Sequence, residues 1–301
     1  MQTFQRIVVF GVGLIGGSFA LALKQASAVA EVVGVGRRRE TLERARALGI
    51  IDSIGSAASV AGADLVLLAA PVAQTEALLR DIAPHLQSGT VVTDAGSTKS
   101  DVVAAARAAL GDKIHQFVPG HPIAGREQNG PEAALPELYR GKKVVLTALP
   151  ENADTCVEKV ATAWQQCGAI IHRLTAQEHD AVFAAVSHLP HLLAYALVAD
   201  IAERDNAARL FQYAASGFRD FTRIAGSSPE MWRDISLANR SALLAELDAY
   251  SAQLSQLRAL LTSADGAGLE KIYGRAQAAR QAWIAAIEAA EQARADEQGG
   301  D

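Results

Sequence analysis

Apolar residues along this chain follow one spacing in the first half and another in the second. Short apolar runs separated by segments of helical spacing predict strands near residues 6–10, 32–35, 64–69, 90–93, 115–118 and 143–147. Such alternation is typical of a parallel, doubly wound α/β sheet. From about Thr175 the strand-like runs stop, and Ala- and Leu-rich segments of helical spacing replace them. The pattern predicts an α/β domain over residues 1–174 and an all-helical domain over residues 175–301.

One apolar stripe of the predicted helical domain has a heptad-like spacing. Its members lie 4, 3, 4, 3 and 4 residues apart and are Leu243, Leu247, Tyr250, Leu254, Leu257 and Leu261. A stripe of this length has to be covered by other apolar groups. Other helices of the same domain would cover it, and so would a second subunit in a homodimer formed through the helical domain.

Composition narrows the class of protein. The chain has 301 residues, of which 50% are hydrophobic, enough for about two domains with sizeable cores. Its net charge is −5, and apart from one short arginine run it has no basic stripe, so nucleic acid is not an expected partner. The longest apolar run, residues 65–73, is too short to cross a bilayer, and we expect no membrane association.

Two further observations predict the compartment. The first predicted strand begins within a few residues of Met1, so we expect no secretory signal. Cys156 and Cys167 are isolated and form neither a metal-type nor a redox-type spacing. Isolated thiols favour a reducing compartment, so we expect a cytoplasmic enzyme.

The apolar run at residues 7–10 leads directly into Gly11-x-Gly13-x-x-Gly16, and the residues after it favour a helix. Gly11 allows a tight turn, Gly13 lets backbone N–H groups approach a pyrophosphate, and Gly16 lets helix and strand pack closely. Glycines of an ordinary turn would leave the flanking strand and helix unexplained. The motif predicts a Rossmann-type site for NAD or NADP, with the candidate ligand-binding residues Gly11, Gly13, Leu14, Ile15, Gly16 and Pro71.

The end of the second predicted strand indicates which nucleotide is bound. An NAD site places an acidic residue there to hold the ribose 2′-hydroxyl, but this chain has Gly36 followed by Arg37, Arg38 and Arg39. Guanidinium groups suit the 2′-phosphate of NADP. The alternative is a solvated basic turn with no ligand. We expect NADP, with NAD tolerated, and Arg37 and Arg38 as contacts.

Candidate catalytic groups follow the fourth and fifth predicted strands, at the edge of the sheet where such folds bind ligands. Asp94-x-Gly96-Ser97-x-Lys99 follows the fourth strand, and Gly120-His121-Pro122-Ile123-Ala124-Gly125 follows the fifth. An imidazole can take the hydroxyl proton when hydride leaves a carbinol carbon, and a serine hydroxyl can orient that hydroxyl. Alternatively, His121 caps a turn and Ser97 caps the following helix.

Five motifs together resemble the prephenate and arogenate dehydrogenases of tyrosine biosynthesis. They are Gly11-x-Gly13-x-x-Gly16, Asp94-x-Gly96-Ser97-x-Lys99, Gly120-His121-Pro122-Ile123-Ala124-Gly125, Ser187-His188-Leu189-Pro190-His191 and Gly217-Phe218-Arg219-Asp220-Phe221-Thr222-Arg223. The resemblance implies NAD(P)-dependent oxidative decarboxylation of prephenate to 4-hydroxyphenylpyruvate, of arogenate to tyrosine, or of both. It implies that His121 accepts the 4-hydroxyl proton, that Ser97 orients that hydroxyl, and that no metal takes part.

The same resemblance implies which residues hold the dianionic substrate. Arg223 matches a carboxylate-binding arginine, His179 and His191 match positions that line the pocket, Trp232 matches an aromatic wall, and Glu127 matches an acid that helps to close it. On a straight helix His179 and His191 lie about 120° apart, so Pro190 would have to bend the segment.

Structural roles are the alternative for these helical-domain residues. His188 and His191 share a helix face, which is typical of a core pair, and no third ligand completes a zinc site. Arg219 or Arg223 could form an ion pair with Asp220 or Asp234.

Two other functions remain open at this stage. One is another NADP-dependent oxidoreductase of the β-hydroxyacid or imine reductase type, against which the Gly-His-Pro-Ile-Ala-Gly and Ser-His-Leu-Pro-His segments argue. The other is a non-catalytic sensor of cofactor redox state.

Overall fold

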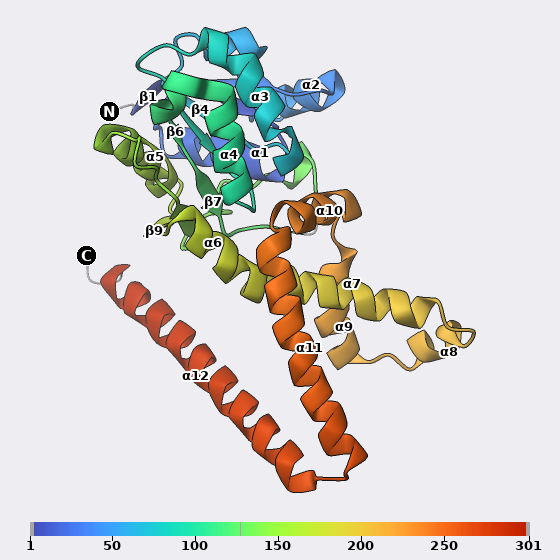
Figure 1. Cartoon of the computed structure of the whole chain (residues 1–301). Coiled ribbons are helices and arrows are strands. Elements are labelled where there is room, and N and C mark those ends of the chain that lie inside the picture. The colour runs from blue at the N-terminus through green and yellow to red at the C-terminus, as the bar shows by residue number, and fades with distance from the viewer. Residues whose placement is uncertain (1–2, 127, 299–301) are drawn as a thin grey trace. The chain divides into compact units, whose positions relative to one another are not determined.

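The computed structural model describes residues 3–126 and 128–298 (Figure 1). By contacts between its parts the chain divides into two compact units, Met1–Leu243 and Leu244–Asp301. The first unit contains the sheets and the helices up to α10. The second contains most of α11 and all of α12.

A six-stranded parallel sheet forms the centre of the first unit. Its strands lie in the order β3-β2-β1-β4-β5-β6, and their bounds are β1 Phe4–Phe10, β2 Val29–Val35, β3 Ser53–Ile54, β4 Leu65–Leu68, β5 Val91–Asp94 and β6 Phe117–Val118. In the central strand, Ile7 pairs with Val32 on one side and with Leu65 on the other. This strand order is that of a dinucleotide-binding fold, with the change of direction between β1 and β4.

A second, smaller sheet corrects one expectation. Residues 143–147 were predicted as the sixth strand of the parallel sheet, but Lys143–Leu146 (β8) joins β7 (Gly120–Pro122) and β9 (Ile170–Arg173). β8 pairs antiparallel with β7 and parallel with β9. The spacing of apolar residues identifies a strand but cannot say which sheet it enters, because that choice is made by long-range pairing. The doubly wound α/β class of the first half is confirmed.

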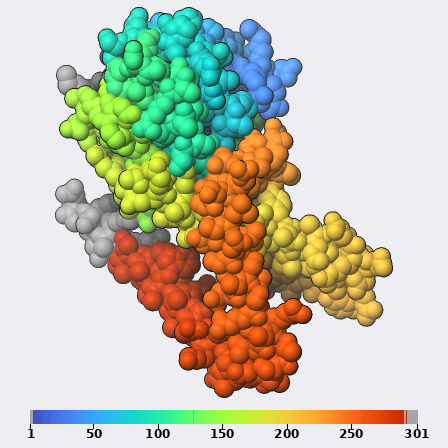
Figure 2. Space-filling model, viewed as in Figure 1, coloured from blue at the N-terminus to red at the C-terminus, as the bar shows by residue number. Residues whose placement is uncertain are grey.

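Helices cover both faces of the parallel sheet because its strands are apolar on both sides. One buried core contains side chains of α1 (Leu14–Gln25), α2 (Arg39–Ala47) and α5 (Asp154–Gln166). The other contains side chains of α3 (Thr75–Ile82) and α4 (Ser100–Leu110), which pack side by side (Figure 1, Figure 2). The two layers hold the carboxyl ends of the strands in place.

The rest of the first unit is helical, as predicted from Thr175 onwards. Its helices are α6 Ala176–Phe183, α7 Leu189–Ala202, α8 Ala207–Gln212, α9 Ser216–Thr222 and α10 Pro229–Ala238. A capping box starts α6: the Thr175 hydroxyl accepts from Glu178 N, and the Glu178 carboxylate accepts from Thr175 N.

A π-helical turn, η6 (Ala184–His188), joins α6 to α7. Pro190 is the second residue of α7 and has no N–H to donate back along the helix, which favours a change of helix type at this point. A π-turn accommodates one extra residue, so it removes about 100° from the angle between residues on either side of it. His179 and His191 therefore come to within about 20° of one face instead of 120°. The turn, rather than a bend at Pro190, changes the relative orientation of the two residues.

Within the described residues, Ala176–Ala202 is long and apolar enough to cross a membrane by length and composition alone. Core helices of globular proteins pass the same test. This stretch includes His179, Asp180 and His188, whose side chains form buried hydrogen bonds. The stretch that most resembles a membrane span is thus Ala176–Ala202 and not the apolar run at residues 65–73. Its buried polar contacts are typical of a protein interior.

The second unit consists of α11 from Leu244 onwards and of α12; the bounds of these helices are Arg240–Thr262 and Gly266–Gln298. The heptad-like stripe runs along α11. Leu243 is buried, whereas Leu254 is 49% and Leu261 64% exposed. Within one chain, the carboxyl-terminal half of the stripe is thus only partly covered.

Candidate active site

The glycine loop between β1 and α1 has the shape that a dinucleotide needs. Gly11 has φ +90°, and a Cβ on it would lie 2.5 Å from the Ala69 carbonyl oxygen. A Cβ on Gly16 would lie 2.2 Å from the Gly11 carbonyl oxygen. A Cβ on Gly13 would meet no atom within 4 Å, so the space beside this residue is open.

Gly13 is also the N-cap of α1 and has no side chain with which to cap it. The N–H groups of the first turn thus face an open space with no acidic residue in that turn. This is a favourable place for a phosphate anion. The residues present therefore fit a nicotinamide dinucleotide.

The other predicted cofactor residues surround this loop. Leu14 is buried, and the carbonyl oxygen of Ile15 accepts a hydrogen bond of 2.6 Å from the Tyr139 hydroxyl. Pro71 is exposed and follows the Ala69 backbone that packs against Gly11. The bond from Tyr139 fixes the start of α1 from a segment that follows the His121 motif.

The arginine run lies between β2 and α2, and its side chains are exposed. Arg39 forms an ion pair of 2.8 Å with Glu43, one turn along α2. No residue in the described part of the chain pairs with Arg37 or Arg38. These two guanidinium groups are free to meet an anion.

A buried carboxylate organises the loops that carry the two catalytic candidates. Asp94, at the end of β5, accepts from Gly96 N at 2.7 Å through Oδ2 and from Gly120 N at 3.0 Å through Oδ1. Its Oδ2 also pairs with the Lys99 ammonium group, and both side chains are buried. Ser97 and His121 each follow a residue whose N–H is held by Asp94. One carboxylate thus fixes the backbone at both positions.

Three side chains then form a line of hydrogen bonds. His121 Nδ1 lies 2.8 Å from His179 Nε2, and His179 Nδ1 lies 2.9 Å from Asp180 Oδ1. The Asp180 carboxylate also accepts from Lys99 N and Ser100 N, both at 2.8 Å. His121 comes from β7, His179 and Asp180 from α6, and the two backbone donors from the start of α4. Residues 81 positions apart in the chain meet here.

The line of hydrogen bonds fixes the proton positions. Burial alone would raise the pKa of Asp180, but the hydrogen bonds from His179, Ser100 and Lys99 outweigh it and lower the pKa to about 2. Asp180 is then an acceptor only, so His179 carries its proton on Nδ1 and accepts through Nε2. His121 must donate from Nδ1. Its Nε2 is left with a free lone pair, as a general base requires.

Electrostatics keep this base unprotonated. Burial lowers the pKa of His121 well below its usual value, and the neighbouring His179, Lys99 and His188 lower it further. Burial also lowers the pKa of His179, although Asp180 opposes the shift. Phe183 packs against both rings, with centroids 4.9 Å from His121 and 4.5 Å from His179. The pair is therefore neutral at neutral pH.

Neither alternative role of the catalytic candidates agrees with these contacts. In the alternative role, Ser97 would cap the N–H groups at the start of α4. These N–H groups instead donate to the Asp180 carboxylate of α6. His121 lies in strand β7 and donates to His179 rather than closing a turn. Ser97 itself is half-buried in the loop before α4.

A second group of predicted residues gathers on α7 and α10. The rings of His191 and Trp232 stack with centroids 3.5 Å apart and planes inclined by 19°. His191 Nδ1 lies 2.8 Å from the Ser187 carbonyl oxygen, which leaves Nε2 available. Arg223 is near enough to lower the pKa of His191, after the larger effect of burial. Arg223, His191 and Trp232 thus lie in one neighbourhood.

The ion pairs considered as an alternative role for the two arginines can be compared with the structure. Arg219 lies 3.9 Å from Asp220 in an exposed pair, and Asp234 pairs with Arg233 at 2.7 Å. Glu127, the predicted closing acid, lies outside the described residues.

Sequence reasoning missed three members of the site: Asp180, Asn239 and the supporting role of His188. Asn239 Nδ2 donates to the Asp180 carbonyl oxygen at 2.8 Å and lies 3.1 Å from His188 Nδ1. Asp180 had a signal in its position next to His179. Asn239 had none, because it lies 51 residues from His188 in the chain.

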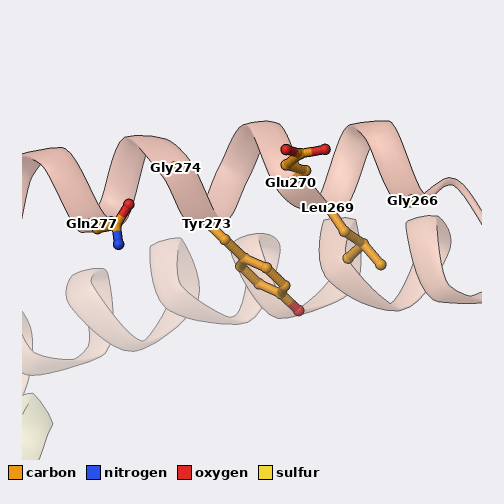
Figure 3. Close-up of a pocket in the computed structure, with 6 residues that line it drawn as sticks. All are labelled: Gly266, Leu269, Glu270, Tyr273, Gly274 and Gln277. Atoms are coloured by element: carbon orange, nitrogen blue, oxygen red, sulfur yellow. The ribbon is translucent and has the colours of Figure 1, made fainter.

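Of two hollows on the surface, one lies away from the candidate site and the other borders its predicted aromatic wall. The larger one, about 530 Å³, is an open hollow lined by α12 residues alone, among them Tyr273 and Gln277 (Figure 3). A second hollow of about 230 Å³ lies between α7 and α10 and is bordered by Trp232 and Tyr195. Geometry and chemistry, rather than cavity size, identify the candidate site.

A parallel sheet of this order with an open glycine loop, together with a histidine relay between β7 and α6, defines a nicotinamide-dependent dehydrogenase with an α/β nucleotide-binding region. Residues 19–173 match the model of the prephenate dehydrogenase nucleotide-binding domain, and residues 175–275 match that of the prephenate dehydrogenase dimerization domain. The chain belongs to the prephenate dehydrogenase family. The resemblance inferred from the five motifs is confirmed.

Individual relatives agree along almost the whole chain. A cyclohexadienyl dehydrogenase of Zymomonas mobilis is 36% identical over 286 residues, 94% of this chain and 97% of the relative. A prephenate dehydrogenase of Bacillus subtilis is 34% identical over 280 residues, 92% of this chain and 75% of the relative.

Solved structures agree as well. The Aquifex aeolicus prephenate dehydrogenase, in complex with hydroxyphenyl propionate and NAD+, has a TM-score of 0.84 and 35% identity, covering 94% of this chain and 98% of that one. The Synechocystis arogenate dehydrogenase has a TM-score of 0.79 and 28% identity, covering 93% and 100%. A D-mandelate dehydrogenase with NADH, at 16% identity and a TM-score of 0.51, shares the fold alone.

Proposed function

We propose that this chain catalyses the oxidative decarboxylation of prephenate, arogenate or both in tyrosine biosynthesis. The observation that carries the proposal is the line His121–His179–Asp180, which leaves a basic nitrogen free at the carboxyl edge of the sheet. The family relationship supports the substrate class. The alternatives, a β-hydroxyacid or imine reductase and a redox sensor, are not favoured by the relatives.

The residues act on the substrate 4-hydroxyl and ring. His121 Nε2 accepts the hydroxyl proton as hydride leaves C4, and Ser97 orients that hydroxyl. A bound nicotinamide supplies the hydride acceptor. The bond between C1 and the ring carboxylate then breaks, CO2 leaves, and the electron pair completes the aromatic ring. His121 returns its proton to the phenolate oxygen, so the reaction consumes and releases no net proton.

His179 and Asp180 support the base during the proton transfer. His121 becomes an imidazolium while His179 Nε2 still accepts from its Nδ1. The Asp180 carboxylate stabilises the positive charge through His179. Asp180 is also tied to the α4 backbone, so the whole relay is held in place before substrate arrives.

The dianionic substrate needs cationic and aromatic contacts. Arg223 would bind a carboxylate in bidentate fashion, with His191 beside it and Trp232 forming a wall through its stack on His191. Glu127 would help to close the pocket. We assign nucleotide binding to residues 1–174, and substrate binding and dimerisation to residues 175–301.

The preferred nucleotide is NADP, with NAD tolerated. Gly36 offers no carboxylate for a ribose 2′-hydroxyl, while the exposed Arg37 and Arg38 offer two guanidinium groups for a 2′-phosphate. Within the glycine loop, Gly11, Gly13 and Gly16 would shape the pyrophosphate site beside Leu14 and Ile15.

The working form is a cytoplasmic homodimer. The partly covered half of the α11 stripe and the exposed Tyr273 and Trp283 of α12 supply apolar surface for a second copy. The family model over residues 175–275 is that of a dimerization domain, which supports this proposal. We expect Leu254→Glu together with Leu261→Glu to shift the protein to a monomer in analytical ultracentrifugation.

One experiment tests the proposed function directly. Purified protein is mixed with prephenate or with arogenate, each with NAD or NADP, and the reduced cofactor is followed by its absorbance together with the release of CO2. We expect turnover with at least one substrate and a higher kcat/KM with NADP. Cofactor reduction without CO2 release, or no reduction with either substrate, would contradict the proposal.

A further inference from the structure

We infer that Asn239 and His188 form a positioning pair. The pair holds the backbone of Ser97 so that the Ser97 side chain meets the substrate hydroxyl, and the inference rests on that proposed role of Ser97. Both side chains are buried, His188 with 2% and Asn239 with 5% of its surface exposed. They come from different elements, η6 and the end of α10. Neither side chain is one of the three hydrogen-bonded groups of the relay.

The orientation of the Asn239 amide follows from its contacts. Its Nδ2 lies 2.8 Å from the Asp180 carbonyl oxygen, which can only accept, so the nitrogen and not the oxygen faces Asp180. The same Nδ2 lies 3.1 Å from His188 Nδ1 and gives its second hydrogen to it. His188 Nδ1 is therefore an acceptor and carries no proton.

The remaining imidazole nitrogen acts on the catalytic loop. With Nδ1 accepting, the neutral ring carries its proton on Nε2, and this donor serves the hydrogen bond between His188 and the Ser97 backbone carbonyl. Burial lowers the pKa of His188 to about 4, which keeps the ring neutral. The ring also meets Trp232 edge-on, with centroids 6.1 Å apart.

The groups around His188 agree with a supporting rather than an acid–base role. His179 and Asp180 of α6 and His191 of α7 are near enough to affect its pKa, and Asn239 caps its Nδ1. Both of its nitrogens are used, one by Asn239 and one by Ser97. No lone pair is left with which His188 could take a proton from substrate.

Two amide substitutions separate the two contacts of the ring. An asparagine amide occupies roughly the place of the imidazole δ nitrogen, and a glutamine amide that of the ε nitrogen. His188→Gln keeps a donor for Ser97, while His188→Asn keeps a partner for Asn239 but cannot reach Ser97. We expect His188→Asn to lower kcat by about 10- to 100-fold, because small displacements of a positioning group have effects of this size. We expect His188→Gln to retain kcat within about threefold of the wild type.

Substrate KM and nucleotide Kd should change little in either variant, and their melting temperatures should agree with each other. Equal losses in both variants would mean that the ring only fills space. Retention of full kcat by His188→Asn would also overturn the inference, since the bond to Ser97 would then be dispensable.

A second measurement does not depend on turnover. In protein labelled with 15N-histidine, two-bond proton–nitrogen correlation spectra report the tautomer of each ring, and the signal lost in His188→Gln identifies His188. We expect the Nε2–H form, unchanged between pH 5.5 and 8, and its loss in Asn239→Asp, whose carboxylate demands a proton on Nδ1. An Nδ1–H form in the wild type refutes the inference. If the tautomer is as expected and no substrate turns over, the proposed function fails while the pairing of these side chains stands.

Discussion

The two regions that the proposed cofactor would join are built on opposite principles. Around His121 the side chains of His179, Asp180, Asp94 and Lys99 are buried and already bonded to other parts of the protein. They leave His121 Nε2 available as a base. Around Arg37 and Arg38 the side chains are exposed, and no described residue pairs with them. One region is held together by bonds within the protein, whereas the other presents charges to an anion from outside.

The difference follows from what each region has to do. A base that takes a proton during hydride transfer must be oriented before the substrate arrives, because reorganisation at that moment would add to the barrier. A phosphate site needs only charge and access, because the ligand brings the negative partner with it. Substitutions in the first region should therefore change kcat, and those in the second should change nucleotide affinity.

The largest effect should follow from His121→Asn. Asparagine fills similar space but has no basic nitrogen, so we expect kcat to fall by about 10³-fold or more. Nucleotide Kd, measured by fluorescence titration, should stay within about twofold. Near-normal turnover in this variant would remove His121 as the base.

Asp180→Asn should have the next largest effect. The amide can no longer hold the His179 proton on Nδ1 as an anion does, so the relay loses its fixed tautomer and we expect kcat to fall by about 100-fold or more. Asp101→Asn is the matched control, because Asp101 is a nearby carboxylate on α4 without a bond to either imidazole. We expect the control to keep kcat within about twofold; equal losses would show that only local charge matters.

A smaller effect should appear at the other region. Arg37→Ala should raise the Kd of NADP by about tenfold, or about 1.4 kcal/mol, and leave that of NAD nearly unchanged. Arg39→Ala is the control, since this arginine already pairs with Glu43 and should change neither Kd by more than about twofold. Equal weakening of both nucleotides by Arg37→Ala would show that this arginine does not bind the 2′-phosphate.

The smallest expected effect is on the pH at which kcat/KM begins to fall. His121 acts as a base only when neutral, and burial lowers its pKa well below 6.5. kcat/KM should therefore be full above pH 6.5 and fall only as the pH drops through the lowered pKa of the free enzyme. A plot of kcat/KM from pH 4.5 to 8 measures this limb. A midpoint above pH 6.5 would mean that the base is more exposed than the structure indicates.

The sequence went furthest where the signal is local. The strands that became β1, β2, β4, β5 and β6 are short apolar runs with helical spacing between them, and Gly11, Gly13 and Gly16 mark the first turn. The two-residue strand β3 and the three-residue strand β7 were not predicted, because such short strands carry no periodicity of their own. The placement of residues 143–146 in a separate sheet was not predicted either, because strand pairing is decided between segments far apart in the chain.

For the candidate site, motifs pointed to His121, His179, His191 and Trp232 but not to what orients them. The π-turn at Ala184–His188 changes which face His191 occupies, and no periodicity of a regular helix contains that change.

The sequence by itself determined the fold class, the glycine loop and the chemical types at the candidate site, because spacing and residue type act over a few positions. Only the tertiary structure decided that His121 donates to a histidine 58 residues away, that one carboxylate of α6 caps α4, and that Asn239 sets the tautomer of His188. A proton position depends on which donors and acceptors face one another in space. That arrangement exists only after segments far apart in the chain have packed together.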